Sequence, residues 1–180
     1  MTEKDFFVRI ANGKRDILGE FLALLEKNKI DYCVIGGLAV NAYAEPVIRL
    51  DLDVVVAIKE LERLRGIFPR EWRLKEDRFS INISTPYSDL RIQLQTDERY
   101  QDFIGRAVMK STLGYALQVA QLEDVVQGEI WAYMGSEHRE SKRLKDLSDI
   151  KRLLESNPDL AHTSVGRTAG TLVSPLNGPS

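Results

Sequence analysis

Two glycines that follow a short apolar run are the feature that most restricts how this 180-residue chain can fold. Residues 32–35 are apolar and rich in β-branched side chains, which predicts a buried strand that stops at Gly36 and Gly37. A glycine has no Cβ, so its backbone can adopt positive φ and can approach a ligand closely. A short helix is predicted to begin directly afterwards, and the first N–H groups of a helix have no partner inside it. The two glycines are therefore a candidate cradle for a phosphate group.

A second apolar strand is predicted over residues 50–58, and it carries two carboxylates. Side chains alternate between the faces of a strand, so Asp51 and Asp53 share one face while Leu, Ile and Val fill the other. Their Cα atoms are expected roughly 6–7 Å apart, which lets the carboxylate oxygens converge on one or two hard cations. Mg²⁺ or Mn²⁺ held there would neutralise the phosphates of a nucleoside triphosphate. The alternative is that Asp51 and Asp53 only form the solvent-exposed face of a half-buried strand.

These residues resemble the nucleotidyltransferase superfamily that includes DNA polymerase β. The resemblance rests on Gly36-Gly37, the helix after them and Asp51-x-Asp53 in an apolar strand, and it is greatest to small bacterial proteins of the abortive-infection toxin type. It continues in residues 121–126 and 141–150, and so covers roughly residues 14–155. The implied fold is α/β (α+β), with a small mixed β-sheet, helices packed on one side and a C-terminal helical portion.

The implied activity is transfer of a nucleotidyl group from a nucleoside triphosphate, with Mg²⁺ or Mn²⁺ as the cofactor. Gly36 and Gly37 would bind the nucleotide, and Asp51 and Asp53 would be both catalytic residues and metal ligands. The acceptor is not identified by the sequence and is a protein hydroxyl, an RNA end or a small molecule. The toxin resemblance adds an antitoxin protein as a further expected partner.

Residues 89–95 alternate between apolar and polar side chains, which predicts another strand. The resemblance places this strand beside the Asp51-x-Asp53 strand and gives it a third catalytic carboxylate, but the matching residue here is Gln93. An amide is neutral, does not accept a proton and binds a hard dication more weakly than a carboxylate does. Two hypotheses therefore stay open: an active nucleotidyltransferase, or a catalytically impaired domain that binds a nucleotide or a protein partner.

Two later helices are predicted over residues 123–134 and 139–155. Lys145 in the second helix is expected to contact the nucleotide, by resemblance to the family's Lys-Asp pattern. The alternative is a solvated helix face on which Lys145 pairs with Asp149 four residues later. In the first helix, relatives commonly carry a lysine near Glu129, so an acid at this position is a second departure from the family.

Composition limits the remaining choices. With 43% apolar and 29% charged residues, the chain is expected to form one domain over residues 1–156, followed by a flexible tail over residues 157–180. The net charge of −2 gives no bulk attraction to nucleic acid. The sole cysteine, Cys33, lies in an apolar strand and cannot form an internal disulfide, and no apolar run is long enough to span a membrane. A cytoplasmic protein with no membrane partner is expected.

Overall fold

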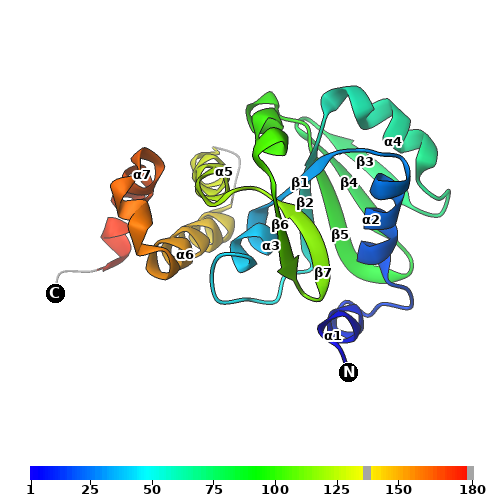
Figure 1. Ribbon diagram of the computed structural model, residues 1–180, viewed down its shortest axis with the longest axis horizontal. Coiled ribbons are helices and arrows are strands. Elements are labelled where there is room, and N and C mark those ends of the chain that lie inside the picture. The colour runs from blue at the N-terminus through cyan, green and yellow to red at the C-terminus, as the bar shows by residue number, and fades with distance from the viewer. Residues whose placement is uncertain (136–138, 178–180) are drawn as a thin grey trace.

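A mixed β-sheet forms the centre of the computed structural model, which describes residues 1–135 and 139–177 (Figure 1). Within the described residues the sheet has seven strands in the order β3-β4-β5-β2-β1-β7-β6. They are β1 (Tyr32–Ile35), β2 (Asp51–Val56), β3 (Arg73–Asp77), β4 (Ser80–Thr85), β5 (Ser88–Gln95), β6 (Val108–Thr112) and β7 (Tyr115–Val119). The helices are α1 (Glu3–Ile10), α2 (Ile17–Lys27), α3 (Gly36–Asn41), α4 (Leu61–Ile67), α5 (Leu122–Met134), α6 (Glu140–Ser156) and α7 (Ser164–Val173).

The strands pair in both directions, which confirms the predicted mixed sheet. β1 runs antiparallel to β2 and parallel to β7, while β2 runs parallel to β5. The two strands predicted to carry the site, β2 and β5, are therefore neighbours near the middle of the sheet. Asp53 lies opposite Gln93 in the register of this pair, as the sequence predicts.

One face of the sheet is the apolar core. Leu52 of β2 lies beside Ile92 of β5, and both side chains are buried on this face. Helix α2, which begins after the N-cap residue Asp16, packs against β5. Phe21 of α2 stacks on Phe68 at the end of α4, with 6.2 Å between the ring centroids, so both helices belong to this layer. Aromatic stacking adds to the burial of these large side chains.

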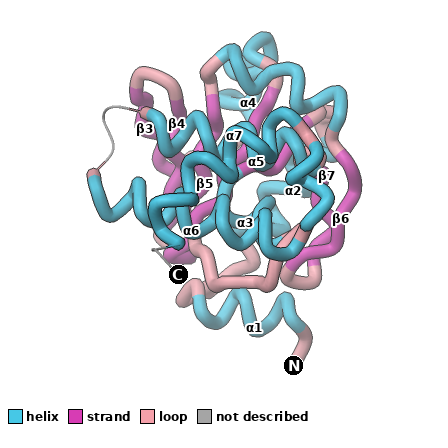
Figure 2. Tube along the Cα trace, turned by 90° about the vertical axis from the view of Figure 1, so that its left-hand side faces the viewer, coloured by secondary structure: helices cyan, strands magenta, loops and turns pink. Residues whose placement is uncertain are grey.

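The last helices form a separate layer at one end of the sheet. Figure 1 shows α5, α6 and α7 grouped on the left, with α3 between them and the strands. Figure 2, turned toward that end, shows the same helices in front of the sheet, with the β3–β4 and β6–β7 pairs at its opposite edges. Helix α3 contacts β2 on one side and α5 and α6 on the other. The chain from Gly36 onward therefore connects the sheet to the helical layer.

The predicted flexible tail after residue 156 is wrong for the part that the structure describes. Residues 158–162 form a 3-10 helix (η3, Pro158–His162), and α7 follows and packs on α6. Leu160, Ala169 and Val173 are buried. Gly166 is needed for close packing, since a Cβ there would lie 1.8 Å from the carbonyl oxygen of Leu160. Gly166, which lies within the expected tail, permits this contact; residues 178–180 lie outside the described residues.

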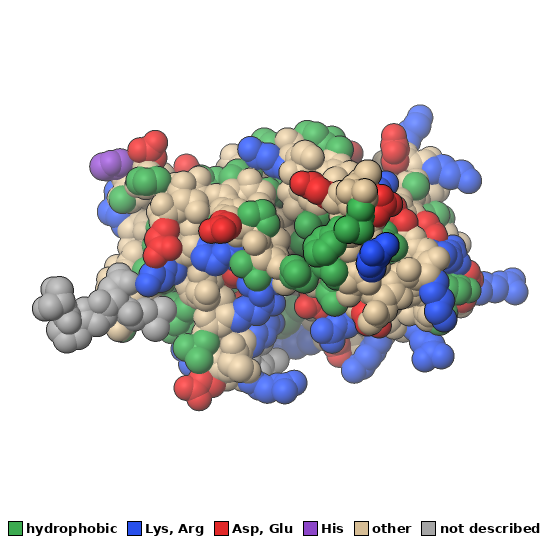
Figure 3. All heavy atoms as spheres, turned by 90° about the horizontal axis from the view of Figure 1, so that it is seen from below, with side chains coloured by type: hydrophobic (Ala, Val, Ile, Leu, Met, Phe, Trp, Pro, Cys, Tyr) green, Lys and Arg blue, Asp and Glu red, His purple; other side chains and the backbone are tan. Residues whose placement is uncertain are grey.

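The surface seen in Figure 3 carries basic and acidic side chains interspersed with one another. This distribution agrees with the net charge of −2. In the described part of the chain, no helix combines the length and the apolar character needed to cross a bilayer.

Candidate nucleotide-binding site

A cavity of about 480 Å³ lies between the polar face of the sheet and the helical layer. Five of the predicted site residues line it: Gly36, Gly37, Asp53, Gln93 and Lys145. The sixth, Asp51, lies outside the lining. The sheet contributes one wall through β2 and β5, and α5 and α6 contribute the opposite wall. The structure therefore brings together side chains from segments more than ninety residues apart in the sequence.

The glycine turn places the backbone of α3 directly against Asp53. Gly36 has a φ of +66°, and a Cβ at this residue would lie 2.3 Å from an Oδ atom of Asp53. Only glycine meets both conditions without strain. Gly37 does not need positive φ; a Cβ there would meet the side chain of Arg49 at 3.0 Å. Gly36 is thus the position at which the turn and the carboxylate require a glycine.

The Asp53 carboxyl group lines the cavity and is poorly solvated. Burial is the main cause that raises its pKa to about 6, and the nearby charge of Asp51 raises it further. Lys145 and Lys142 oppose this rise from α6. Since a dication would favour the charged form of Asp53, the site has the electrostatic character of one that is completed by a positive ion.

Asp51 has a different environment from Asp53. Its carboxylate accepts an ion pair from Arg91 of β5, with 3.0 Å between Asp51 Oδ1 and Arg91 Nε, and its side chain is 41% exposed. Within residues 1–135 and 139–177, no three Asp, Glu, His or Cys side chains converge to hold a metal ion. The oxygen donors present on this face therefore fit a cation only if Asp51 turns from Arg91 and phosphate oxygens complete the shell, as Mg²⁺ sites commonly require.

The helical wall of the cavity carries both signs of charge. Lys142 and Lys145 of α6 line it together with Asp146 and Asp149, and Glu129 lines it from α5. Glu129 is 5% exposed, and burial followed by the charges of Asp149, Asp146 and Asp53 raises the pKa of its carboxyl group well above the usual value. Lysines at this wall suit the phosphates of a nucleotide, whereas the acids need a cation or a proton donor nearby.

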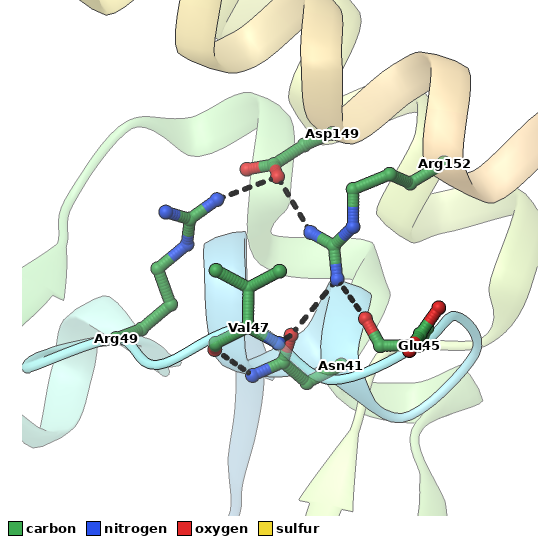
Figure 4. A network of polar contacts seen from close by, with 6 residues as sticks. All are labelled: Asn41, Glu45, Val47, Arg49, Asp149 and Arg152. Carbon is green, nitrogen blue, oxygen red and sulfur yellow. Dashed lines mark hydrogen bonds and ion pairs between the residues drawn. The ribbon is translucent and has the colours of Figure 1, made fainter.

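A polar network that the sequence did not predict fixes the chain between α3 and β2 (Figure 4). Asp149 of α6 is 1% exposed and accepts hydrogen bonds from Arg49 at 2.7 Å and from Arg152 at 2.8 Å. Arg152 also donates to the side chain of Asn41, which in turn holds the backbone of Val47. The network ties α6 to the segment that leads into Asp51. An arginine two residues before the Asp51-x-Asp53 pair was the signal available in the sequence.

We expect Asp149→Asn to destabilise the fold, because both arginines would lose a buried counter-charge. The expected loss is about 3 kcal/mol, at the low end for a broken buried ion pair, since the arginine side chains keep some exposure. Urea unfolding of the variant measures this loss. Glu155→Gln on the same helix is the matched control, because its pair with Lys151 is exposed and should contribute less than about 1 kcal/mol. Equal losses in both variants would contradict the role of the network.

The raised pKa of Asp53 predicts a pH dependence of stability in protein free of divalent cations. A carboxyl group whose folded pKa exceeds its unfolded pKa stabilises the fold while protonated, and this contribution is lost as pH rises through the folded value, here about 6. The loss is about 3 kcal/mol at most for a shift of this size. Asp53→Asn should therefore be more stable than the original protein at pH 7, with the difference shrinking toward pH 4. Parallel curves of unfolding free energy against pH would contradict this prediction.

Comparison with known proteins identifies solved structures that have a similar fold. No protein-family model and no curated protein sequence matches the chain. Among solved structures, the antibiotic-resistance factor ANT(2'')-Ia is similar, with a TM-score of 0.58, 15% identity, and coverage of 89% of this chain and 91% of that one. An antigenic nucleotidyltransferase-like protein from Paracoccidioides brasiliensis gives a TM-score of 0.56 at 18% identity, covering 97% and 90%.

A third structure, the lincosamide antibiotic adenylyltransferase LnuA with lincomycin bound, has a TM-score of 0.53 and 11% identity, and the similarity covers 79% of this chain and 99% of that one. All three similarities extend over most of both chains at low identity. They show that this protein has the nucleotidyltransferase fold, which confirms the fold predicted from the sequence.

Proposed function

We propose that this protein binds a nucleoside triphosphate together with Mg²⁺ or Mn²⁺ and transfers its nucleotidyl group to an acceptor hydroxyl. The observation that carries the proposal is the close approach of the Gly36 backbone to the Asp53 carboxylate in the lining of a cavity in this fold. Phosphate oxygens and the cation would occupy the cavity beside this turn and Asp53. Lys145 lines the opposite wall and supplies positive charge for the triphosphate.

Each residue has a defined part in the proposed reaction. The backbone of Gly36 and Gly37 binds phosphate oxygens, and Asp51 and Asp53 bind the cation. The bound cation supplies charge neutralisation of the phosphates and alignment of the attacking and leaving oxygens. Asp51 must break its ion pair with Arg91 to bind the cation. Breaking this exposed pair costs little free energy, since such pairs contribute about 0–1 kcal/mol to stability.

The acceptor is proposed to be a small molecule. The cavity volume of about 480 Å³ is in the range of small-ligand sites, and the structurally similar LnuA is a lincosamide adenylyltransferase with lincomycin bound. A protein hydroxyl and an RNA end are the other two acceptor classes, and each is an outcome of the experiment below.

A second function is favoured by Gln93. Its amide lies directly opposite Asp53 in the β2–β5 register, where a third carboxylate would complete the site. A domain that binds the nucleotide or a protein partner without rapid transfer would keep Gly36, Gly37 and Asp53 and could dispense with the third acid. Binding without transfer of label distinguishes this function from the first.

The experiment that tests the proposal is incubation of the protein with each nucleoside triphosphate labelled at the α-phosphate, with Mg²⁺ or Mn²⁺. Separate reactions receive small hydroxylated antibiotics, total RNA, or a bacterial protein extract as the acceptor. We expect cation-dependent label transfer that disappears in a variant carrying both Asp51→Asn and Asp53→Asn. Binding without transfer supports the second function, and the absence of binding to every triphosphate contradicts both.

The toxin resemblance implies a biological setting for the same chemistry, with an antitoxin protein as partner. Expression of the protein in a bacterial host should then slow growth, and the Asp51→Asn, Asp53→Asn variant should not. Equal growth with both proteins would contradict a toxin role. Nucleotidyl transfer itself would still be tested by the label assay.

A further inference from the structure

Glu129 is an acid in the cavity to which the proposed function gives no part. It lies on α5, faces the cavity and is 5% exposed. Across the part of the chain that the structure describes, no hydrogen bond and no ion pair involves its carboxyl group. Buried polar side chains nearly always have a partner, because desolvating a carboxyl group without one is costly. The carboxyl group of Glu129, which is buried without such a partner, is therefore available to a ligand that enters the cavity.

The other charged groups around Glu129 already have positions in the site. Asp149 is held by Arg49 and Arg152, and Asp53 lies against Gly36 on the opposite wall. Lys145 and Asp146 of α6 line the same cavity, and their charges act on the carboxyl group of Glu129. The surroundings therefore hold an excess of acid, which opposes a negative charge on Glu129 and makes its carboxylate a good acceptor for a proton.

The reaction needs such an acceptor. When an acceptor hydroxyl attacks the α-phosphorus, its proton must leave, and Gln93 on β5 cannot take it because an amide is not a base in water. Asp51 and Asp53 are committed to the cation in the proposed function. Glu129 remains as a carboxyl group that faces the same cavity from the helical wall.

We propose that Glu129 is the catalytic base of the transfer reaction, a role that rests on the proposed function. The acceptor oxygen forms a bond to the α-phosphorus, and the bond between that phosphorus and the pyrophosphate oxygen breaks, with the electron pair leaving on pyrophosphate. The proton of the acceptor hydroxyl passes to a carboxylate oxygen of Glu129. The base thus comes from α5 instead of from the strand beside Asp53.

The test uses water as the acceptor, so that it does not depend on identifying the natural one. Pyrophosphate release from a mixture of the four nucleoside triphosphates is measured for the full chain and for Glu129→Gln, Glu129→Ala and Glu123→Gln. Glu123 is exposed on the same helix and serves as the matched control. Binding of non-hydrolysable α,β-methylene triphosphates is measured alongside, together with the melting temperature.

We expect both Glu129 variants to lose about 10²–10³-fold in maximal rate, which is typical for a general base, with analogue affinity and melting temperature retained. Sodium formate should restore at least tenfold to Glu129→Ala by entering the space of the lost side chain, and should not restore Glu129→Gln. Full activity in Glu129→Ala, or no rescue by formate in a folded variant, overturns the assignment. A wild-type protein that binds the analogue but releases no pyrophosphate overturns it as well, whereas failure to bind the analogue contradicts the proposed function itself.

Discussion

Replacing Asp51 and Asp53 together with asparagine should weaken cation-dependent nucleotide binding by about a hundredfold or more. Each asparagine keeps the shape of the side chain and removes the charge that attracts the cation. Losing a charged contact costs about 1.5–3 kcal/mol, and two such losses exceed the 2.7 kcal/mol that corresponds to about a hundredfold. Titration calorimetry with a non-hydrolysable triphosphate in Mg²⁺ measures the change.

The matched control carries the same chemical change at two exposed acids, Asp31→Asn with Asp159→Asn, neither of which lines the cavity. It should bind the analogue as the original protein does. Loss of fold is not an alternative explanation for the site variant, because Asp53→Asn is expected to stabilise the protein at neutral pH. Unchanged affinity in the site variant would show that Asp51 and Asp53 are not cation ligands.

Gln93→Asp should raise the rate of nucleotidyl transfer by about ten- to a hundredfold, with much less change in nucleotide affinity. The substitution puts a carboxylate directly opposite Asp53 on the cavity face of the β2–β5 pair. It would provide a ligand for a second cation beside the one that Asp51 and Asp53 would hold, and such a cation would lower the pKa of the attacking hydroxyl. Pyrophosphate release at saturating nucleotide measures the rate.

Gln95→Asp is the control for this substitution. Gln95 lies two residues further along the same strand and also lines the cavity, but it pairs with Val55 instead of Asp53. The same change at this position should leave the rate within about twofold of the original, since the added carboxylate lies opposite Val55 and not opposite Asp53. Equal gains at both positions would indicate a general effect of negative charge, and no gain at position 93 would show that the site does not use an acid there.

The centre of the site could be predicted from the sequence because its geometry is local. Gly36 follows a strand of fixed direction, and the alternation of β2 decides which face Asp53 occupies. The position of Gln93 beside Asp53 also followed from the alternation of its strand, once the family resemblance had paired the two strands. These inferences depend on residue spacing and not on how distant segments pack.

The features that were missed depend on contacts between distant segments. Arg49 and Asp149 are one hundred residues apart, and nothing in the local sequence pairs them. Asp51 was expected in the cavity, but its carboxylate instead forms an ion pair with Arg91 of the neighbouring strand. The residues of helix α7 were expected to form a tail because Gly, Ser and Thr are common among them, although Ala169 and Val173 lie one turn apart on its buried face. Their packing against η3 and α6 becomes evident only in three dimensions.

Retention of Mn²⁺ in equilibrium dialysis, with and without a non-hydrolysable nucleoside triphosphate, tests the central claim most directly. Two carboxylates give a cation too few ligands, so phosphate oxygens must complete the site. We predict that the protein retains Mn²⁺ only when the triphosphate is present, and that Asp53→Asn retains none above the amount bound by the nucleotide alone. Retention that is the same with and without the triphosphate, or that survives Asp53→Asn, would contradict a cation-nucleotide site in this cavity.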